Sequence, residues 1–206
     1  MMDVIAAHRR ALADALDTLT PDQWRGQSLC AGWTPAHVLA HMTMPFRIPA
    51  DEFMTGLQRC GGDFTAFSDE MAARDSALPP AELVAALREN ADLPWSPPGG
   101  GLSGALSHDV IHGLDITWPI DLKYEIPDRA MTLVLDSVAS PGATTLFGFS
   151  LAGIKVTAND LNWTAGDGAQ LIGRGRDLLP LLAGRRIPRA PFAGDGAGVV
   201  WPGAAG

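Results

Sequence analysis

The sequence is poor in cysteine, in basic side chains and in long apolar runs, and each scarcity argues against a class of protein. Its two cysteines, Cys30 and Cys60, are too few for a disulfide framework, so we expect thiols in a reducing compartment. It has 15 basic against 23 acidic side chains and a formal net charge of −8. Because nucleic-acid binding requires a positive surface, a small molecule is the expected partner instead.

No window approaches the roughly 18 uninterrupted apolar residues of a membrane-spanning helix. The N-terminal segment carries charges within its apolar part, which is unlike a secretory signal. Apolar residues make up 47% and charged residues 18% of the chain, values typical of folded globular proteins. We therefore predict a cytoplasmic protein without a membrane partner, either a monomer or a homodimer.

Apolar periodicity and helix-start signals predict a mainly α-helical chain. Residues 2–19 follow a helical period. A second helix is predicted to begin at Thr34, a good N-cap, with Pro35 at the first helical position. Pro45 and Pro49 are expected to kink or break it, because proline lacks the amide donor. Further helices are predicted within 50–60, 63–77, 80–92, 103–119 and 127–140.

The pattern changes after residue 145, where apolar and polar residues alternate around Asn-Asp and Gly-Asp-Gly turn signals. This alternation predicts a hairpin or three short strands, followed by a closing helix in "RDLLPLLAGR" with Gly184 as its C-cap. The predicted organisation is a helical bundle over 1–142, a small α/β domain over 143–190 and a loose tail over 191–206.

Four of the five histidines form two pairs spaced four residues apart, His37 with His41 and His108 with His112. On a helix this spacing directs both rings to one point, which is how a helix supplies two metal ligands. A solvated pair is the alternative. His41 has apolar neighbours and is expected to point inward, where an imidazole needs a partner. A capping role explains His37, and His8 is interpreted as a surface residue.

Two segments carry a family resemblance. "SLCAGWTPAHVLAHM" and "ALSHDVIHGLDI" resemble the DinB-like superfamily and, within it, the mycothiol-dependent maleylpyruvate isomerase family. The shared residues are Cys30, Gly32, Trp33, Thr34 and His41 in the first segment and His108, Asp109, His112, Gly113 and Asp115 in the second. Residues 154–185 are similar to the C-terminal α/β domain of this family. The chain departs from it at Ala36 and His37, where an acidic or basic pair is frequent.

The resemblance implies a DinB-like four-helix bundle with a small C-terminal α+β appendage. It also implies a divalent metal, usually zinc, held by His41, His108 and His112, and a low-molecular-weight thiol such as mycothiol. Three histidines with an open fourth position are typical of catalytic zinc, which generates hydroxide or thiolate near neutral pH. The predicted activity is that of a metal-dependent thiol S-transferase or a maleylpyruvate isomerase-like isomerase. Family members differ in activity, however, and a fold does not determine the substrate.

Two alternative functions remain open: a thiol-independent metal hydrolase or lyase, and a non-catalytic module that binds a small ligand. Asp115 lies three residues after His112 and is a candidate catalytic residue, as base or as orienting group, unless it only hydrogen-bonds locally. Cys30 is interpreted as a packed thiol and Trp33 as a core anchor. The appendage contains three arginines, Arg174, Arg176 and Arg185. They either bind a carboxylate of the substrate or lie on the solvated surface without a binding role.

Overall fold

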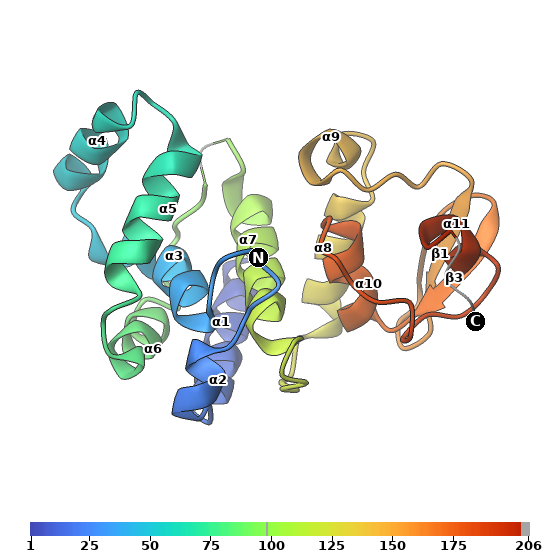
Figure 1. The fold of residues 1–206 in the computed structure, drawn as a ribbon, viewed down its shortest axis with the longest axis horizontal. Coiled ribbons are helices and arrows are strands. Elements are labelled where there is room, and N and C mark those ends of the chain that lie inside the picture. The colour runs from blue at the N-terminus through green and yellow to red at the C-terminus, as the bar shows by residue number, and fades with distance from the viewer. Residues whose placement is uncertain (98, 203–206) are drawn as a thin grey trace. The chain divides into compact units, whose positions relative to one another are not determined.

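The computed structural model describes residues 1–97 and 99–202 and divides into two compact units, Met1–Glu125 and Ile126–Gly206 (Figure 1). The described residues of the first unit are mainly helical, and those of the second combine shorter helices with a small sheet. This architecture confirms the predicted fold class. Within the same residues, no helix is both long and apolar enough to cross a lipid bilayer.

The N-terminal unit is built on a four-helix bundle. Its helices are α1 (Met2–Leu16), α2 (Pro21–Arg25), α3 (Pro35–Arg47), α4 (Ala50–Arg59), α5 (Phe64–Asp75), α6 (Pro80–Glu89) and α7 (Gly101–Thr117). Helices α1 and α3 each pack against both α6 and α7, which closes the bundle, and α5 packs on the outside of α3. The core between the four helices is filled by buried aliphatic side chains such as Leu12, Leu39 and Leu87.

Helix α3 follows the predicted start signal, because Thr34 is its N-cap and Pro35 occupies its first position. The predicted break occurs at the second proline only. Pro45 stays inside the last turn of α3, whereas Pro49 becomes the N-cap of α4. The chain therefore turns between α3 and α4, on the C-terminal side of His41.

Up to residue 202, where its description ends, the C-terminal unit combines four helices with a three-stranded sheet of order β2-β1-β3. Its elements are α8 (Asp128–Val138), α9 (Ala143–Phe147), β1 (Ile154–Ala158), β2 (Trp163–Gly166), β3 (Ala169–Gly173), α10 (Gly175–Leu182) and α11 (Gly196–Val200). Strand β1 pairs antiparallel with β2 and parallel with β3. The division between the units lies after Glu125 rather than at the predicted residue 142, because α8 packs against α10.

The segment 191–202 is ordered by its own contacts, which differs from the expectation of a loose tail over 191–206. Ala193 forms an antiparallel bridge with Ile172 at the edge of β3. Phe192 stacks on Trp201 with ring centroids 5.1 Å apart, and the Trp201 indole donates a hydrogen bond to the carbonyl of Ile187. These two large aromatic rings supply buried apolar surface that the small residues around them cannot. The rest of the predicted loose tail, residues 203–206, lies outside the described residues.

Candidate metal centre

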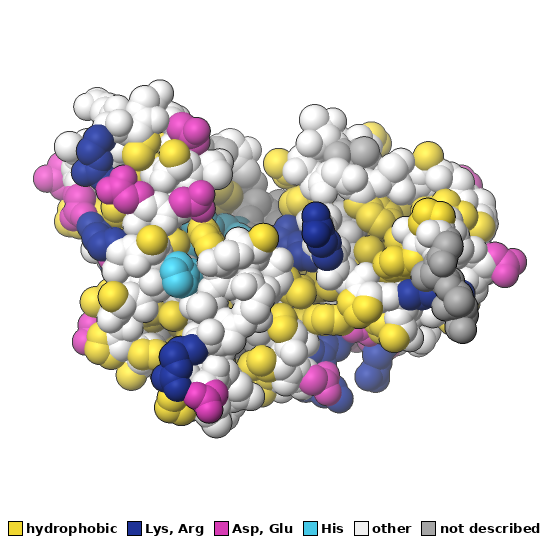
Figure 2. Space-filling view, viewed as in Figure 1, with side chains coloured by type: hydrophobic (Ala, Val, Ile, Leu, Met, Phe, Trp, Pro, Cys, Tyr) yellow, Lys and Arg dark blue, Asp and Glu magenta, His cyan; other side chains and the backbone are white. Residues whose placement is uncertain are grey.

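Helices α3 and α7 bring three histidines of the N-terminal unit together. His41 comes from α3, and His108 and His112 lie one turn apart on α7. One ring nitrogen from each lies within 4.8 Å of the others, and the ring centroids are 4.8–5.1 Å apart. All three rings are partly buried. Figure 2 accordingly shows little histidine surface on the face that it presents.

A glycine sets how closely α7 approaches the rest of the bundle. A Cβ atom at Gly113 would lie 2.6 Å from the hydroxyl of Tyr124 and 3.1 Å from a methyl of Leu12 on α1. A larger residue would therefore push α7 away from α1. Gly113 directly follows His112, so this close packing fixes the position of the helix at the point where it carries the histidines.

The second nitrogen of each ring is already engaged. The Nδ1 atoms of His41, His108 and His112 lie 2.7, 3.0 and 2.9 Å from oxygen atoms of Ser68, Asp109 and Asp115, respectively. A carboxylate only accepts hydrogen bonds, so the Nδ1 atoms of His108 and His112 carry the protons. In the neutral form of these two rings, Nε2 is then the atom with the lone pair, and the Nε2 of His108 lies 3.1 Å from that of His41.

Burial keeps His41 neutral. Removal from water, followed by the repulsion of His112 and His108, lowers the pKa of His41 from 6.5 to about 2. A neutral imidazole is the form that binds a metal ion. The donor set therefore consists of three imidazole nitrogens, two of them on rings that carboxylates orient, which is an arrangement that suits zinc.

A buried ion pair stands behind His108. The Nε of Arg9, on α1, donates to Asp109 over 2.6 Å, and both side chains are almost fully buried. The Nη1 of Arg9 also donates to the backbone carbonyls of Asn90 and Leu93. Burial acts to raise the pKa of Asp109, but the hydrogen bond from His108 and the charge of Arg9 hold it below its usual range. Asp109 is therefore an ionised partner of His108.

Asp115 has the corresponding position behind His112. Its side chain is fully buried, and its Oδ2 atom accepts hydrogen bonds from the His112 ring and from the Cys30 thiol at 3.2 Å. Cys30, His112 and Asp115 also form a second group whose ligand atoms lie within 4.8 Å of one another. The structure thus places Asp115 where it orients a histidine; its predicted role as a base remains a prediction.

Two tryptophans flank the three histidines. The ring centroid of Trp33, from the loop before α3, lies 5.4 Å from that of His41. The ring centroid of Trp95 lies 5.3 Å from that of His108. Trp33 also packs against the bundle core, as expected. Trp95 lies in a Pro- and Gly-rich loop, where no periodicity or spacing pointed to it. The centre therefore has an aromatic wall on two sides.

The other predicted residues have different positions. His37 contacts the Thr34 hydroxyl through Nδ1 at 2.8 Å, so its local capping role is confirmed. His8 was expected at the surface but is fully buried, with its Nε2 3.0 Å from the Tyr124 hydroxyl. Burial lowers its pKa from 6.5 to about 4. The expectation failed because His8 lies on the face of α1 that packs in the bundle. The three arginines considered for carboxylate binding belong to the C-terminal unit.

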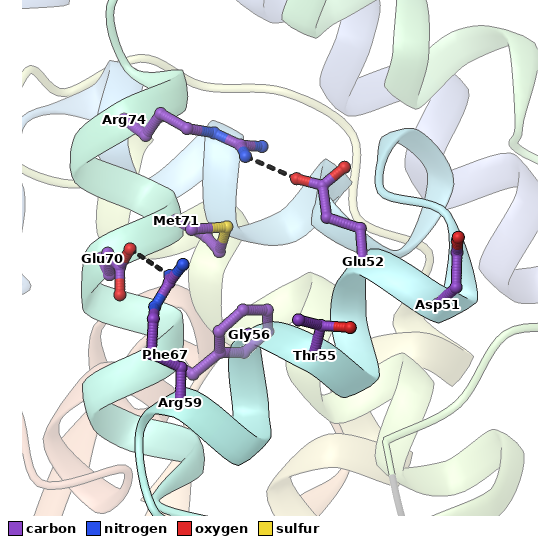
Figure 3. Close-up of a pocket in the computed structure, with 9 residues that line it drawn as sticks. All are labelled: Asp51, Glu52, Thr55, Gly56, Arg59, Phe67, Glu70, Met71 and Arg74. Atoms are coloured by element: carbon purple, nitrogen blue, oxygen red, sulfur yellow. Dashed lines mark hydrogen bonds and ion pairs between the residues drawn. The ribbon is translucent and has the colours of Figure 1, made fainter.

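A separate hollow of about 330 Å³ lies between α4 and α5 of the same unit (Figure 3). Arg59 pairs with Glu70 and Arg74 pairs with Glu52 along its walls, above a floor that includes Phe67. No histidine of the described chain lines this hollow, and these four charged groups are paired with one another. The hollow is therefore distinct from the histidine centre in both its residues and its chemistry.

Comparison with known proteins supports the predicted resemblance. Residues 5–93 match the family described as the mycothiol maleylpyruvate isomerase N-terminal domain. The whole fold is similar to crystal structures of the mycothiol-dependent maleylpyruvate isomerase and of a mutant of it, each with a TM-score of 0.55 over 95% of this chain and 92% of that one. Sequence identity is 14% and 15%, respectively. No curated protein matches the chain in sequence.

The two comparisons cover different parts of the centre. The family match includes α3 with His41 but ends before α7, which carries His108 and His112. The structural similarity extends over almost the whole chain, and at this identity it establishes the fold and no more. Neither comparison assigns a role to the three histidines, so a function has to be proposed from the fold and the geometry of this group together.

Proposed function

We propose, from the family match and the histidine geometry together, that the chain is a divalent-metal-dependent enzyme that uses a low-molecular-weight thiol. The reaction class is S-transfer, conjugate addition or thiol-assisted isomerisation of a small electrophile. The observation that carries this proposal is the convergence of three imidazole nitrogens whose opposite ring atoms are all engaged. Such a donor set leaves a fourth coordination position for an exogenous ligand.

The residues present fit a zinc ion, and His41, His108 and His112 would hold it. When bound, zinc supplies Lewis acidity and stabilises a thiolate or hydroxide near neutral pH. The side chains of Asp109 and Asp115 keep two ligand rings in one tautomer. Trp33 and Trp95 restrict water around the histidines and offer apolar surface to a substrate.

The thiol component of the proposal is supported by the family to which the N-terminal residues match. A mycothiol-like thiol is the proposed cofactor, and a small electrophile such as an enoate is the proposed substrate. A cytoplasmic location is proposed with it, because a thiol cofactor requires a reducing compartment. A monomeric or homodimeric state is part of the same proposal.

Metal content is the first test. Wild-type protein purified and loaded with Zn²⁺ should hold about one metal ion per chain, whereas His41→Ala and His112→Ala should each retain roughly a tenth or less, since a three-ligand site loses most of its affinity with one ligand. His37→Ala is the matched control, because His37 lies on the same helix outside the centre. Wild-type protein without metal under these conditions would refute the proposal.

Thiol dependence is the second test. The metal-loaded protein is incubated with maleylpyruvate or a simpler enoate, with and without mycothiol. Turnover or adduct formation that requires the thiol supports the proposed reaction class. Turnover that is indifferent to the thiol contradicts it and favours a hydrolase or lyase that uses metal-bound hydroxide.

A further inference from the structure

The charges buried behind the histidines determine which ligand the centre can accept. Asp109 and Asp115 contribute two negative charges, and the guanidinium of Arg9 contributes one positive charge within hydrogen-bond distance of Asp109. The three side chains are 2%, 0% and 0% exposed, respectively. Because they lie out of water, their charges act on the centre with little screening.

The charge balance follows from these three side chains. Neutral histidines add no charge, so a divalent cation at the centre, with two carboxylates and one guanidinium, leaves one positive charge in excess. A single negative charge on the fourth ligand cancels it. Without the guanidinium the same centre would already be neutral, and a neutral fourth ligand would leave it balanced.

We propose that Arg9 is a specificity-determining residue that makes the centre select a monoanion, such as a thiolate, over a neutral ligand at its fourth position. This inference rests on the proposed function, because it requires a metal ion on the three histidines. It goes beyond that function by assigning the charge of the ligand to a residue on α1 that touches neither the metal ligands nor the open position.

Hydrogen bonds and an aromatic contact hold the Arg9 side chain from several sides, so its guanidinium stays next to Asp109. Nη1 donates to backbone carbonyls after α6, Nε donates to Asp109 on α7, and the guanidinium lies 5.0 Å from the ring centre of Phe46 on α3. Its Nη2 atom is buried and has no hydrogen-bond partner among the described residues. The side chain is therefore held with its charge in place although its hydrogen bonding is incomplete.

A purely structural role explains these contacts less well. A buried ion pair adds little net stability, since apolar residues of similar volume often stabilise a protein as much or more. An ion pair that only joined α1 to α7 would also not require Asp109 to contact the ring of His108, which belongs to the centre. The contact of Asp109 Oδ1 with His108 Nδ1 at 3.0 Å gives the charge of Arg9 a direct route to it.

The test compares anion binding with neutral-ligand binding in Co²⁺-loaded protein, followed through the visible absorption of the cobalt. Thiocyanate is the monoanionic probe and imidazole the neutral one. Arg9→Met should weaken thiocyanate binding roughly tenfold or more and leave imidazole binding within about twofold, since it removes a charge that two hydrogen bonds, through Asp109, link to the ring of His108. Arg10→Met is the matched control, because Arg10 is the next residue of α1 and pairs with Asp92 at the surface.

Two further variants keep the test decisive if Arg9→Met does not fold. Arg9→Lys retains the charge and should bind thiocyanate nearly as well as the wild type. Asp115→Asn removes a negative charge while its amide oxygen still accepts hydrogen bonds, so it should tighten thiocyanate binding roughly tenfold. Thiocyanate affinities that do not follow the charge in the folded variants would overturn the proposal.

The outcome also separates this inference from the proposed function. If wild-type protein binds no Co²⁺, the metal centre itself is refuted and the role of Arg9 with it. If it binds Co²⁺ but Arg9→Met and Asp115→Asn leave the preference for thiocyanate over imidazole unchanged, the metal centre stands and the role assigned to Arg9 is wrong.

Discussion

The N-terminal unit buries ionisable side chains, whereas the interior of the C-terminal unit is apolar in every buried side chain that the structure describes. The buried ionisable residues of the first unit are His8, Arg9, Asp75, Asp109 and Asp115. The buried set of the second unit includes Val156, Leu171, Leu178 and Leu182. Burial of charge costs free energy unless each group is paired. The interior of the first unit therefore depends on pairing of its buried polar groups, and that of the second does not.

Surface charge differs in the same way. Residues 1–125 carry 8 basic and 17 acidic side chains, whereas residues 126–206 carry 7 basic and 6 acidic ones. The acidic balance of the chain thus belongs to the N-terminal unit. Arg9 is a buried basic residue in this mainly acidic unit, and its ion pair with Asp109 is where substitutions test the contrast between the two interiors most directly.

The largest effect is expected from separating the buried ion pair. Asp109→Ala leaves the guanidinium of Arg9 buried and uncompensated, so the free energy of unfolding should fall by about 3–5 kcal/mol in urea denaturation. The double variant Arg9→Met with Asp109→Leu should lose much less, because no unpaired charge remains. A loss below about 1 kcal/mol in the single variant would show that water reaches the pair.

The matching change in the C-terminal unit is apolar. Leu178→Ala, at a fully buried position of α10, should lower the free energy of unfolding by about 3 kcal/mol through lost burial and the remaining cavity. Unlike the change at Asp109, it should leave the metal content per folded chain unchanged. A loss of metal in this variant would contradict the division of roles between the two units.

Sensitivity to acid should reside in the N-terminal unit, which contains all five histidines. The pKa of His8 is lowered from 6.5 to about 4 in the folded chain, so the unfolded chain takes up the proton first as the pH falls. The contribution of His8 to the free energy of unfolding is complete above pH 6.5. As the pH falls from 6.5 to 4, this contribution decreases by about 1.4 kcal/mol per pH unit.

The comparison that isolates this contribution is His8→Gln against wild type in metal-free protein, with urea denaturation at pH 7 and pH 5. The variant should show a shallower pH dependence by the amount assigned to one histidine. Identical slopes in the two proteins would mean that His8 titrates normally in the folded chain.

The smallest effect concerns a polar contact of the C-terminal unit. The Trp163 indole donates to Asp136 over 2.8 Å, and Asp136 is exposed to water. Asp136→Ala should therefore cost only about 1 kcal/mol, because water replaces the lost acceptor. A loss comparable to that at Asp109 would remove the contrast between buried and exposed polar groups.

The pairing of His108 with His112 and the start of the helix that carries His41 could be predicted from the sequence, because a four-residue spacing and an N-cap are local signals. The choice of these three histidines as a ligand set came from the family resemblance. Their partners depend on tertiary packing. Ser68 meets His41 from another helix, 27 residues away, and Arg9 meets Asp109 from 100 residues away. Nothing in the segment "AHRRAL" distinguishes the buried Arg9 from the exposed Arg10 except the face of α1 that the bundle covers.

The errors in organisation have the same origin. The amphipathic pattern of residues 127–140 predicts a helix, and α8 is there, but the pattern does not say which unit it packs in. The small residues of 191–202 suggested a loose segment, and the stacking of Phe192 on Trp201 depends on the fold of the chain between them. Local sequence therefore specified the elements, and long-range contacts specified their partners.

The separation of Arg9 from Asp109 also bears on the order in which the chain folds. Arg9 is synthesised 100 residues before the carboxylate that it pairs with, and the His41–His108 contact spans 67 residues. Contacts of such long sequence separation form late, because the intervening chain must first be ordered. Arg9 must therefore stay hydrated until α7 docks, and the three histidines come together only as the bundle closes.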